Sequence, residues 1–154
     1  MIFLAKHQAI MNLSRLPVNP DIGLLVIRVG IGLSYFFLHG LPKLMGGPER
    51  WERVGSAMQY LGITFGYPFW GFMAAFAESI GALAFALGFL FRPATTLLFL
   101  TMAVAFSYHM GKGDTLGQAS HALEMGILFL GMLFMTPGKY ALDTWLKERR
   151  ATHH

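Results

Sequence analysis

Four long apolar runs constrain the fold of this chain more than any other feature of its sequence. They cover about residues 22–41, 68–91, 93–110 and 121–136. A helix needs about 20 mostly apolar residues to cross a bilayer; the first two runs reach that length, and the last two lie near its lower limit. Only 13% of the residues are charged, against about 25% in soluble domains. The runs therefore predict membrane-spanning helices.

The connections between the runs predict how these helices are arranged. Proline is favourable in the first turn of a helix, which fits Pro68 and Pro93, and Gly111 and Pro137 are typical helix stops. The connection around Arg92 is so short that the second and third helices must be antiparallel. We expect one all-α domain over residues 1–154, an antiparallel four-helix bundle integral to the membrane.

The lysines and arginines beside the runs predict the orientation of the bundle, because such residues are enriched in cytoplasmic loops. With both termini in the cytoplasm, seven flanking cations lie inside and four outside. The inner set is Lys6, Arg15, Arg92, Lys139, Lys147, Arg149 and Arg150, and the outer set is Lys43, Arg50, Arg53 and Lys112. This balance favours a multi-pass protein with its N-terminus and C-terminus inside.

Two further segments are amphipathic. Residues 48–61 place Trp51, Val54, Met58 and Leu61 on one helical face. We expect this segment to form an interfacial helix between the first and second spans. Residues 139–154 form a basic tail, and basic segments of this kind bind the anionic cytoplasmic leaflet.

Seven polar side chains lie within or at the edges of the predicted spans: Arg28, Tyr35, His39, Glu78, His109, His121 and Glu124. A charge at the bilayer centre costs at least about 2.5 kcal/mol, so such residues usually face the bundle interior. In the predicted orientation the three histidines meet near the outer surface, above the two glutamates and the arginine. We therefore expect one polar cluster inside the bundle.

Several interpretations of this cluster stay open. Arg28 could form a buried ion pair with Glu78 or Glu124, and the histidines could cap helix ends. A metal site suited to zinc or iron would use His39, His109 and His121, with Glu124 as the fourth ligand. A quinone site needs a donor, an acidic proton acceptor and an apolar slot, and His39, Tyr35 and Glu124 could supply its polar groups.

Composition excludes some functions. The chain has no cysteine, which excludes thiol catalysis and iron–sulfur ligation by its own residues. Its net charge is +4, but no basic stripe with interleaved aromatic residues is present, so we expect no nucleic-acid partner. The expected partner is the lipid bilayer.

Three motifs occur in a fixed order along the chain. They are "IRVGIGLSYFFLHGLPKLMGG", "FAESIGALAFALGFLFRPATTLL" and an acidic residue early in the fourth run. From about Gly23 to Leu142 the chain thereby resembles the DoxX family of small bacterial membrane proteins. The positions that fall on the family's pattern are Arg28, Lys43, Glu78, Gly81, Arg92 and Glu124.

This resemblance implies a four-helix bundle in the bacterial inner membrane. The family takes its name from membrane subunits of an archaeal thiosulfate:quinone oxidoreductase, and other members look like partners in oxidative-stress complexes. The resemblance therefore implies a role in redox metabolism, together with a soluble or membrane-bound redox partner.

Our leading hypothesis is a membrane subunit of redox metabolism that offers a quinone or another lipophilic partner a polar pocket near the outer leaflet. His39 and His109 would donate hydrogen bonds to a carbonyl oxygen, and Glu124 and Glu78 would relay protons beside Arg28. The alternatives are a non-enzymatic scaffold or accessory protein, and a pathway for small solutes or protons. A homo-oligomer is compatible with each, and the residues alone do not decide whether the chain is an enzyme.

Overall fold

The computed structural model describes residues 19–152, and these residues form helices without a strand. The flanking cations Lys6 and Arg15, and the last two residues of the basic tail, lie outside the described residues. Three helical segments are long and apolar enough to cross a membrane: Pro20–Met45, Tyr67–Leu87 and Phe91–Gly111. The chain is therefore an all-helical protein with three candidate spans.

The first two candidate spans each contain a π-helical turn. The first consists of α2 (Pro20–Tyr35), the π turn η1 (Phe36–Gly40) and α3 (Leu41–Met45). The second consists of α5 (Tyr67–Phe76), the π turn η3 (Ala77–Gly81) and α6 (Ala82–Leu87). A π turn inside an α-helix is rare and occurs frequently at functional sites. These turns hold His39 and Glu78, two of the predicted site residues.

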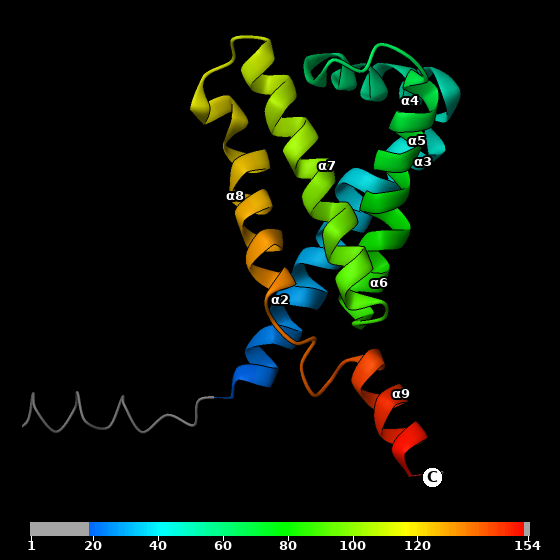
Figure 1. Cartoon of the computed structure of the whole chain (residues 1–154), viewed down its shortest axis with the longest axis vertical. Helices are drawn as coiled ribbons and strands as arrows, with labels where there is room; N and C mark the ends of the chain where they lie inside the picture. Colours follow the sequence, from blue (N-terminus) through cyan, green and yellow to red (C-terminus); the bar gives the residue numbers. More distant parts are fainter. Residues whose placement is uncertain (1–18, 153–154) are drawn as a thin grey trace, which may run out of the picture.

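The third candidate span, α7 (Phe91–Gly111), forms a hairpin with α8 (Leu116–Leu133). Figure 1 shows the two helices side by side, with α2 crossing the molecule. The fourth predicted span, residues 121–136, falls largely in α8, which is not one of the three candidate spans. Its first turns carry Gln118, His121 and Glu124, and these residues lower its hydropathy. A fourth span remains a prediction.

Helix α8 begins at Leu116, five residues before the apolar run that starts at residue 121. Thr115 and Gln118 form a capping box, in which each side chain accepts a hydrogen bond from the backbone N–H of the other residue. This arrangement satisfies amide groups that otherwise lack partners at a helix N-terminus. The cap, rather than hydrophobicity, sets where the helix begins.

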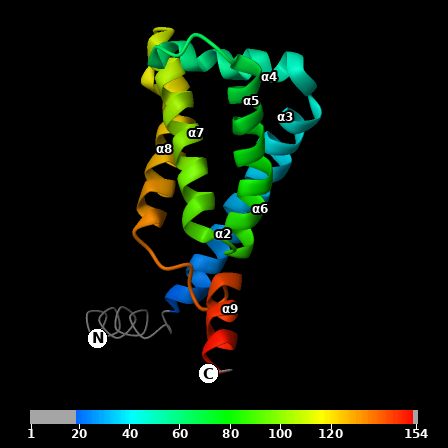
Figure 2. The ribbon, with the colours of Figure 1, turned by 45° about the vertical axis from the view of Figure 1, so that its right-hand side comes forward.

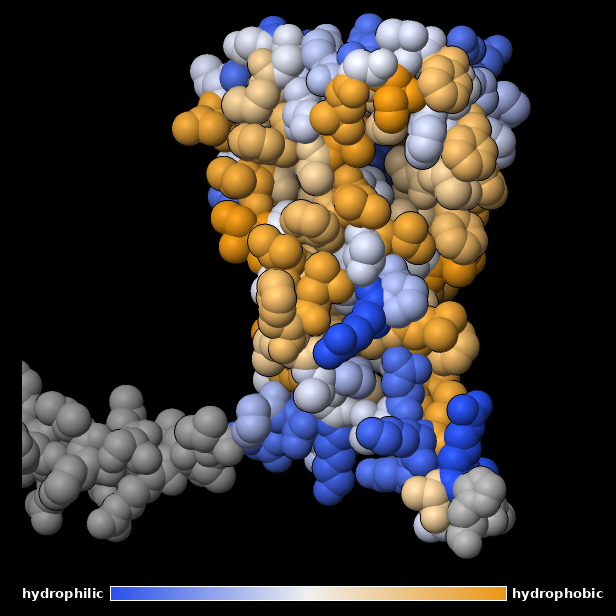
Figure 3. Space-filling model, in the orientation of Figure 1, coloured by the Kyte–Doolittle hydropathy of each residue, from blue (hydrophilic) through white to orange (hydrophobic). Residues whose placement is uncertain are grey.

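The amphipathic segment forms α4 (Gly47–Gly55) and the 3₁₀ helix η2 (Ser56–Leu61). Figures 1 and 2 show this segment lying across one end of the molecule, where α4 packs on α5 and η2 packs on α7. At the opposite end, α9 (Leu142–Ala151) follows α8 through an extended connection. Figure 3 shows the face of the molecule that is seen in Figure 1. Hydrophobic residues cover the middle of this face, and hydrophilic residues gather mostly at its two ends.

The core lies where α2, α6, α7 and α8 meet. Phe85 stacks on Phe91, with ring centroids 5.6 Å apart, and Phe129 meets Phe85 edge to face at 5.5 Å. Leu98 and Met102 of α7 complete the cluster. Rings in these geometries attract each other beyond the effect of their buried area. This contact ties the α7–α8 hairpin to the second span.

Helix α4 packs unusually close to α5 through two glycines. A Cβ atom on Gly71 would overlap the carbonyl oxygen of Trp51, and a Cβ atom on Gly55 would overlap that of Tyr67. Small residues let helix backbones approach in this way. The pair of glycines therefore fixes α4 across the end of the second span.

We predict that Gly71→Ala lowers the thermal stability of the protein in detergent. The added methyl group has no room against the backbone of Trp51, and overpacking of this kind costs about 1–3 kcal/mol. Gly30→Ala is the matched control, since nothing lies within 4 Å of a Cβ atom at Gly30. An equal melting temperature for the two variants would contradict the close packing.

A carboxylate of α9 caps the distant helix α7. Asp143 accepts hydrogen bonds from the backbone N–H groups of Leu90 and Phe91, both at 2.9 Å, and its own N–H donates to the carbonyl oxygen of Gly88 at 2.9 Å. Leu90, at the N-cap, has a left-handed backbone and makes no side-chain cap of its own. The turn between α6 and α7 thus depends on α9.

We predict that Asp143→Ala destabilises the protein by about 1–2 kcal/mol, the range measured for loss of an N-cap. The Asp143→Asn variant keeps one side-chain oxygen as an acceptor and should lose less stability. Thermal unfolding in one detergent measures both changes. If the two variants unfold at the wild-type temperature, Asp143 does not hold the turn.

Candidate functional site

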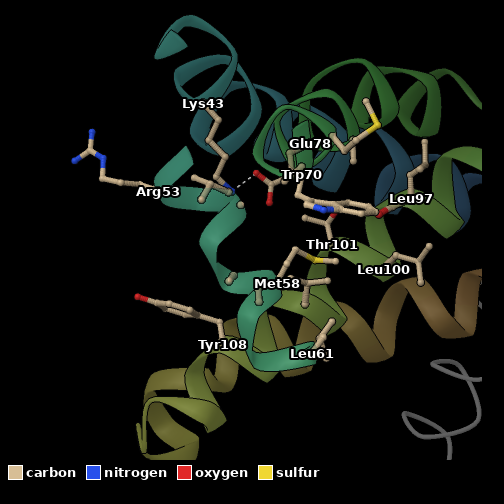
Figure 4. Close-up of a pocket in the computed structure, with 18 of the residues that line it drawn as sticks. Lys43, Arg53, Met58, Leu61, Trp70, Glu78, Leu97, Leu100, Thr101 and Tyr108 are labelled. Atoms are coloured by element: carbon tan, nitrogen blue, oxygen red, sulfur yellow. Dashed lines mark hydrogen bonds and ion pairs between the residues drawn. The ribbon is translucent and has the colours of Figure 1, made fainter. Parts of the chain in front are cut away.

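A cavity of about 890 Å³ lies between α5 and α7, beneath α4 and η2. Its walls are mostly apolar. They include Met58, Leu61, Met73, Leu97, Leu100 and Val104. Figure 4 shows the side chains of Leu97, Leu100, Met58 and Trp70 around it. Because α5 and α7 both belong to candidate spans, the cavity lies beside apolar helices that are long enough to cross a membrane.

The polar feature of the cavity is an ion pair between Lys43 of α3 and Glu78 of η3, drawn as a dashed line in Figure 4. The side chain of Glu78 is 3% exposed and that of Lys43 is 22% exposed. A carboxylate buried among apolar helices must be neutralised. The pair neutralises Glu78 and leaves part of the Lys43 side chain accessible.

The two π turns position this pair. A Cβ atom on Gly40 of η1 would overlap the carbonyl carbon and oxygen of Glu78, so the backbones of the two turns touch. Ser79 donates a hydrogen bond to the carbonyl oxygen of Ala75 at 2.6 Å, which occupies a carbonyl near the π turn. The close contact between the first and second spans therefore places Lys43, three residues after Gly40, within reach of Glu78.

The end of the cavity at α4 is lined by charged and aromatic side chains. Arg50 and Arg53 of α4 line it and are exposed, and Trp70 and Tyr108 add aromatic rings. In Figure 4 the guanidinium group of Arg53 points away from the cavity. Trp51 fixes α4 to α3 by donating from Nε1 to the carbonyl oxygen of Lys43 at 2.9 Å. Tryptophan, tyrosine and arginine in one place are typical of a membrane–water interface.

Arg28 does not pair with Glu78 or with Glu124, contrary to one interpretation of the sequence. It is 1% exposed and donates from Nη2 to the carbonyl oxygen of Tyr140 at 2.9 Å. Its Nε and Nη1 atoms have no hydrogen-bond partner among the described residues. Arg28 does not reach either glutamate because it lies near Gly88 and Ala141, at the α9 end of the molecule. Lys43 reaches Glu78 instead, from the end of the first span.

Three other predicted residues do meet. Tyr35 and His121 lie within hydrogen-bond distance, with 3.3 Å between the hydroxyl oxygen and Nε2. The rings of His39 and His121 stack with centroids 5.2 Å apart, and the hydroxyl group of Tyr35 also contacts Sδ of Met102 at 3.2 Å. This Tyr–His–His group joins α2, η1 and α8. None of its three residues lines the cavity.

His109 and Glu124 lie apart from this group. Nδ1 of His109 lies 2.8 Å from Oδ2 of Asp114, in the turn after α7, and Glu124 is exposed on α8. Within residues 19–152, no group of three or more histidine, aspartate or glutamate side chains is arranged to hold a metal ion. The structure therefore does not bring His39, His109, His121 and Glu124 together as metal ligands.

The comparisons with known proteins identify the family of the chain. No curated protein and no solved structure matches it. The sequence model of the DoxX family matches residues 23–110, which include the Lys43–Glu78 pair and all the residues that line the cavity. Because that match covers more than half of the chain, the protein belongs to the DoxX family.

Proposed function

We propose that this protein binds a quinone, or another lipophilic molecule with a polar head, in the cavity between α5 and α7. The observation that carries the proposal is an apolar cavity that contains a largely buried ion pair. Small-molecule sites are mostly apolar clefts of about 300–1,000 Å³ with a few convergent polar groups. The cavity, at about 890 Å³ and with Lys43 and Glu78 in its wall, fits that description.

The ion pair has the chemistry to hold a polar head. A lysine ammonium has three N–H donors, and the salt bridge to Glu78 uses one of them. The remaining donors can bind a carbonyl oxygen of a quinone-type head, while Glu78 accepts or returns a proton near the same place. His39 and His109, the donors expected from the sequence, do not line the cavity. In this proposal Lys43 takes their role.

The surroundings support a ligand that comes from the lipid. Two facing walls come from the candidate spans that contain α5 and α7, so an apolar tail can lie between them without entering water. The arginines and aromatic rings at the α4 end suit the depth of lipid head groups. Helix α4 would then lie at the membrane surface as an interfacial helix, with α8 as the fourth span and both termini in the cytoplasm.

We further propose that the bound molecule serves redox metabolism in the bacterial inner membrane, where the chain acts as a membrane subunit beside a redox partner. This part rests on membership of the DoxX family. A quinone bound beside a proton-carrying pair could exchange its protons there while the partner supplies or removes its electrons. A scaffold that binds no lipophile is the alternative, and it predicts an empty cavity.

The ligand test uses two threonines of α7 as a matched pair. Thr101 lines the cavity and Thr96 does not, and each donates to the carbonyl oxygen four residues earlier at 2.9 Å. We predict that Thr101→Trp fills the cavity and weakens binding of a short-tailed quinone analogue at least about tenfold, or 1.4 kcal/mol. Thr96→Trp should bind as the wild type does.

Binding to the purified protein is measured by titration, and organic extraction followed by mass spectrometry identifies what co-purifies. Equal binding by the two tryptophan variants would place the ligand elsewhere. If extraction yields no lipophile and no analogue binds, the scaffold is the better account.

A second prediction concerns the ion pair. Removing one buried partner strands the other charge, whereas replacing both removes that penalty. We predict that Lys43→Met alone lowers the melting temperature, and that Lys43→Met with Glu78→Leu restores most of it. Neither variant should bind the analogue with wild-type affinity, because both lack the ammonium donor. Wild-type binding by a well-folded double variant would show that the pair is architectural.

A further inference from the structure

Glu124 lies on the side of α8 that faces away from the other described helices. It is exposed, and it lies in line with Gly117 and Gly131, one heptad before and after it. At 100° per residue these three positions share one face of the helix. The buried residues Ala119, Ala122 and Phe129 lie on the opposite face. The sequence had predicted that Glu124 would point into the bundle.

The depth of Glu124 follows from the contacts of α8 with α7. A Cβ atom on Gly126 would lie 3.6 Å from the side chain of Met102, and Met102 is in the middle of the candidate span Phe91–Gly111. Glu124 is only two residues from Gly126. It therefore lies beside α7, near the middle of that candidate span.

The surface around Glu124 is apolar. Leu123 is 37% exposed, Ile127 62%, Leu130 41% and Phe134 83%. Within the described part of the chain, Glu124 has no hydrogen-bond or salt-bridge partner from another side chain. An ionisable group at membrane depth almost always faces protein or a water-filled cavity. This face of α8 is therefore expected to be covered by protein.

We propose that a second copy of this chain covers it, in a two-fold dimer that pairs the α8 helices. The face carries both members of an acid–base pair. His121 is exposed one turn before Glu124, its Nε2 atom faces Tyr35, and its Nδ1 atom has no hydrogen-bond partner among the described residues. In a two-fold interface, when residue i contacts residue j, j also contacts i. An interface that brings Glu124 to His121 of the second copy therefore forms this pair twice.

The two glycines let the helices approach closely enough for these contacts. Nothing lies within 4 Å of a Cβ atom at Gly131, and a Cβ atom at Gly117 would touch only the side chain of Thr115. Small residues on one face permit close packing between membrane helices. The pairing buries both carboxyl groups beside imidazoles and removes the apolar face of α8 from the lipid. The dimer does not depend on the ligand of the cavity.

The chain has no cysteine, so single cysteines can test this interface in membranes. Ile127→Cys places a thiol on the face, and Val26→Cys is a control on α2 with matched exposure, at 62% and 64% in the wild type. With a short bismaleimide crosslinker, we expect a covalent dimer at least about tenfold more abundant for Ile127→Cys than for Val26→Cys.

Two substitutions in the Ile127→Cys background test the details. Gly131→Leu blocks the close approach and should reduce the crosslinked dimer about tenfold, whereas Gly30→Leu, on an equally open position of α2, should not. Glu124→Leu should also reduce it, because the pairing with His121 is lost. Equal crosslinking at positions 26 and 127, a monomer by native mass spectrometry, or crosslinking of position 127 only to another protein would each overturn the proposal.

Discussion

The ion pair between Lys43 and Glu78 is the interaction on which the rest of the architecture depends. A carboxylate that is 3% exposed between apolar helices needs a partner, because the low dielectric strengthens attraction but penalises an isolated charge. The partner is Lys43, which lies near the C-terminal end of the first span. The first and second spans must therefore cross at the point along their axes where Lys43 can reach Glu78. The touching π turns, η1 and η3, set that point. An architectural requirement thereby places a charged pair at the wall of a cavity.

The cavity exists because two neighbouring contacts are very tight. At the α4 end, Gly55 and Gly71 bring α4 and α5 into backbone contact, and at the core Phe85, Phe91 and Phe129 hold α6 against the α7–α8 hairpin. Between these contacts α5 and α7 are left apart, and the space is lined by flexible side chains such as Met58 and Met73. Methionine adapts its shape to irregular surfaces, which suits a site for a lipophilic tail.

Hydrophobic runs predict four spans, three of which the structure confirms as candidate spans, and the amphipathic pattern at 48–61 predicts a helical segment there. The family was indicated separately, by the resemblance of three motifs. The partners of the charges were not predictable in the same way. Lys43 looked like a flanking cation because it follows the apolar run, yet its long side chain reaches back to Glu78. Arg28 donates a hydrogen bond to the carbonyl oxygen of Tyr140, which lies 112 residues later in the sequence. Such long-range choices depend on crossing angles and π turns, which residue spacing does not encode.

Glu78 and Glu124 show how one rule gives two different outcomes. Both carboxylates belong to helices that are apolar on most of their surface, and both need a partner to avoid lipid. Glu78 lies on a face crowded by small residues, where the first span comes within reach of its carboxylate, so its partner is internal. Glu124 lies on the face of α8 that no described helix covers, and no side chain among residues 19–152 pairs with it. The expectation that membrane charges face inward therefore holds within one chain for Glu78, whereas for Glu124 it requires cover from outside the described helices, and this requirement is the basis of the proposed α8 dimer.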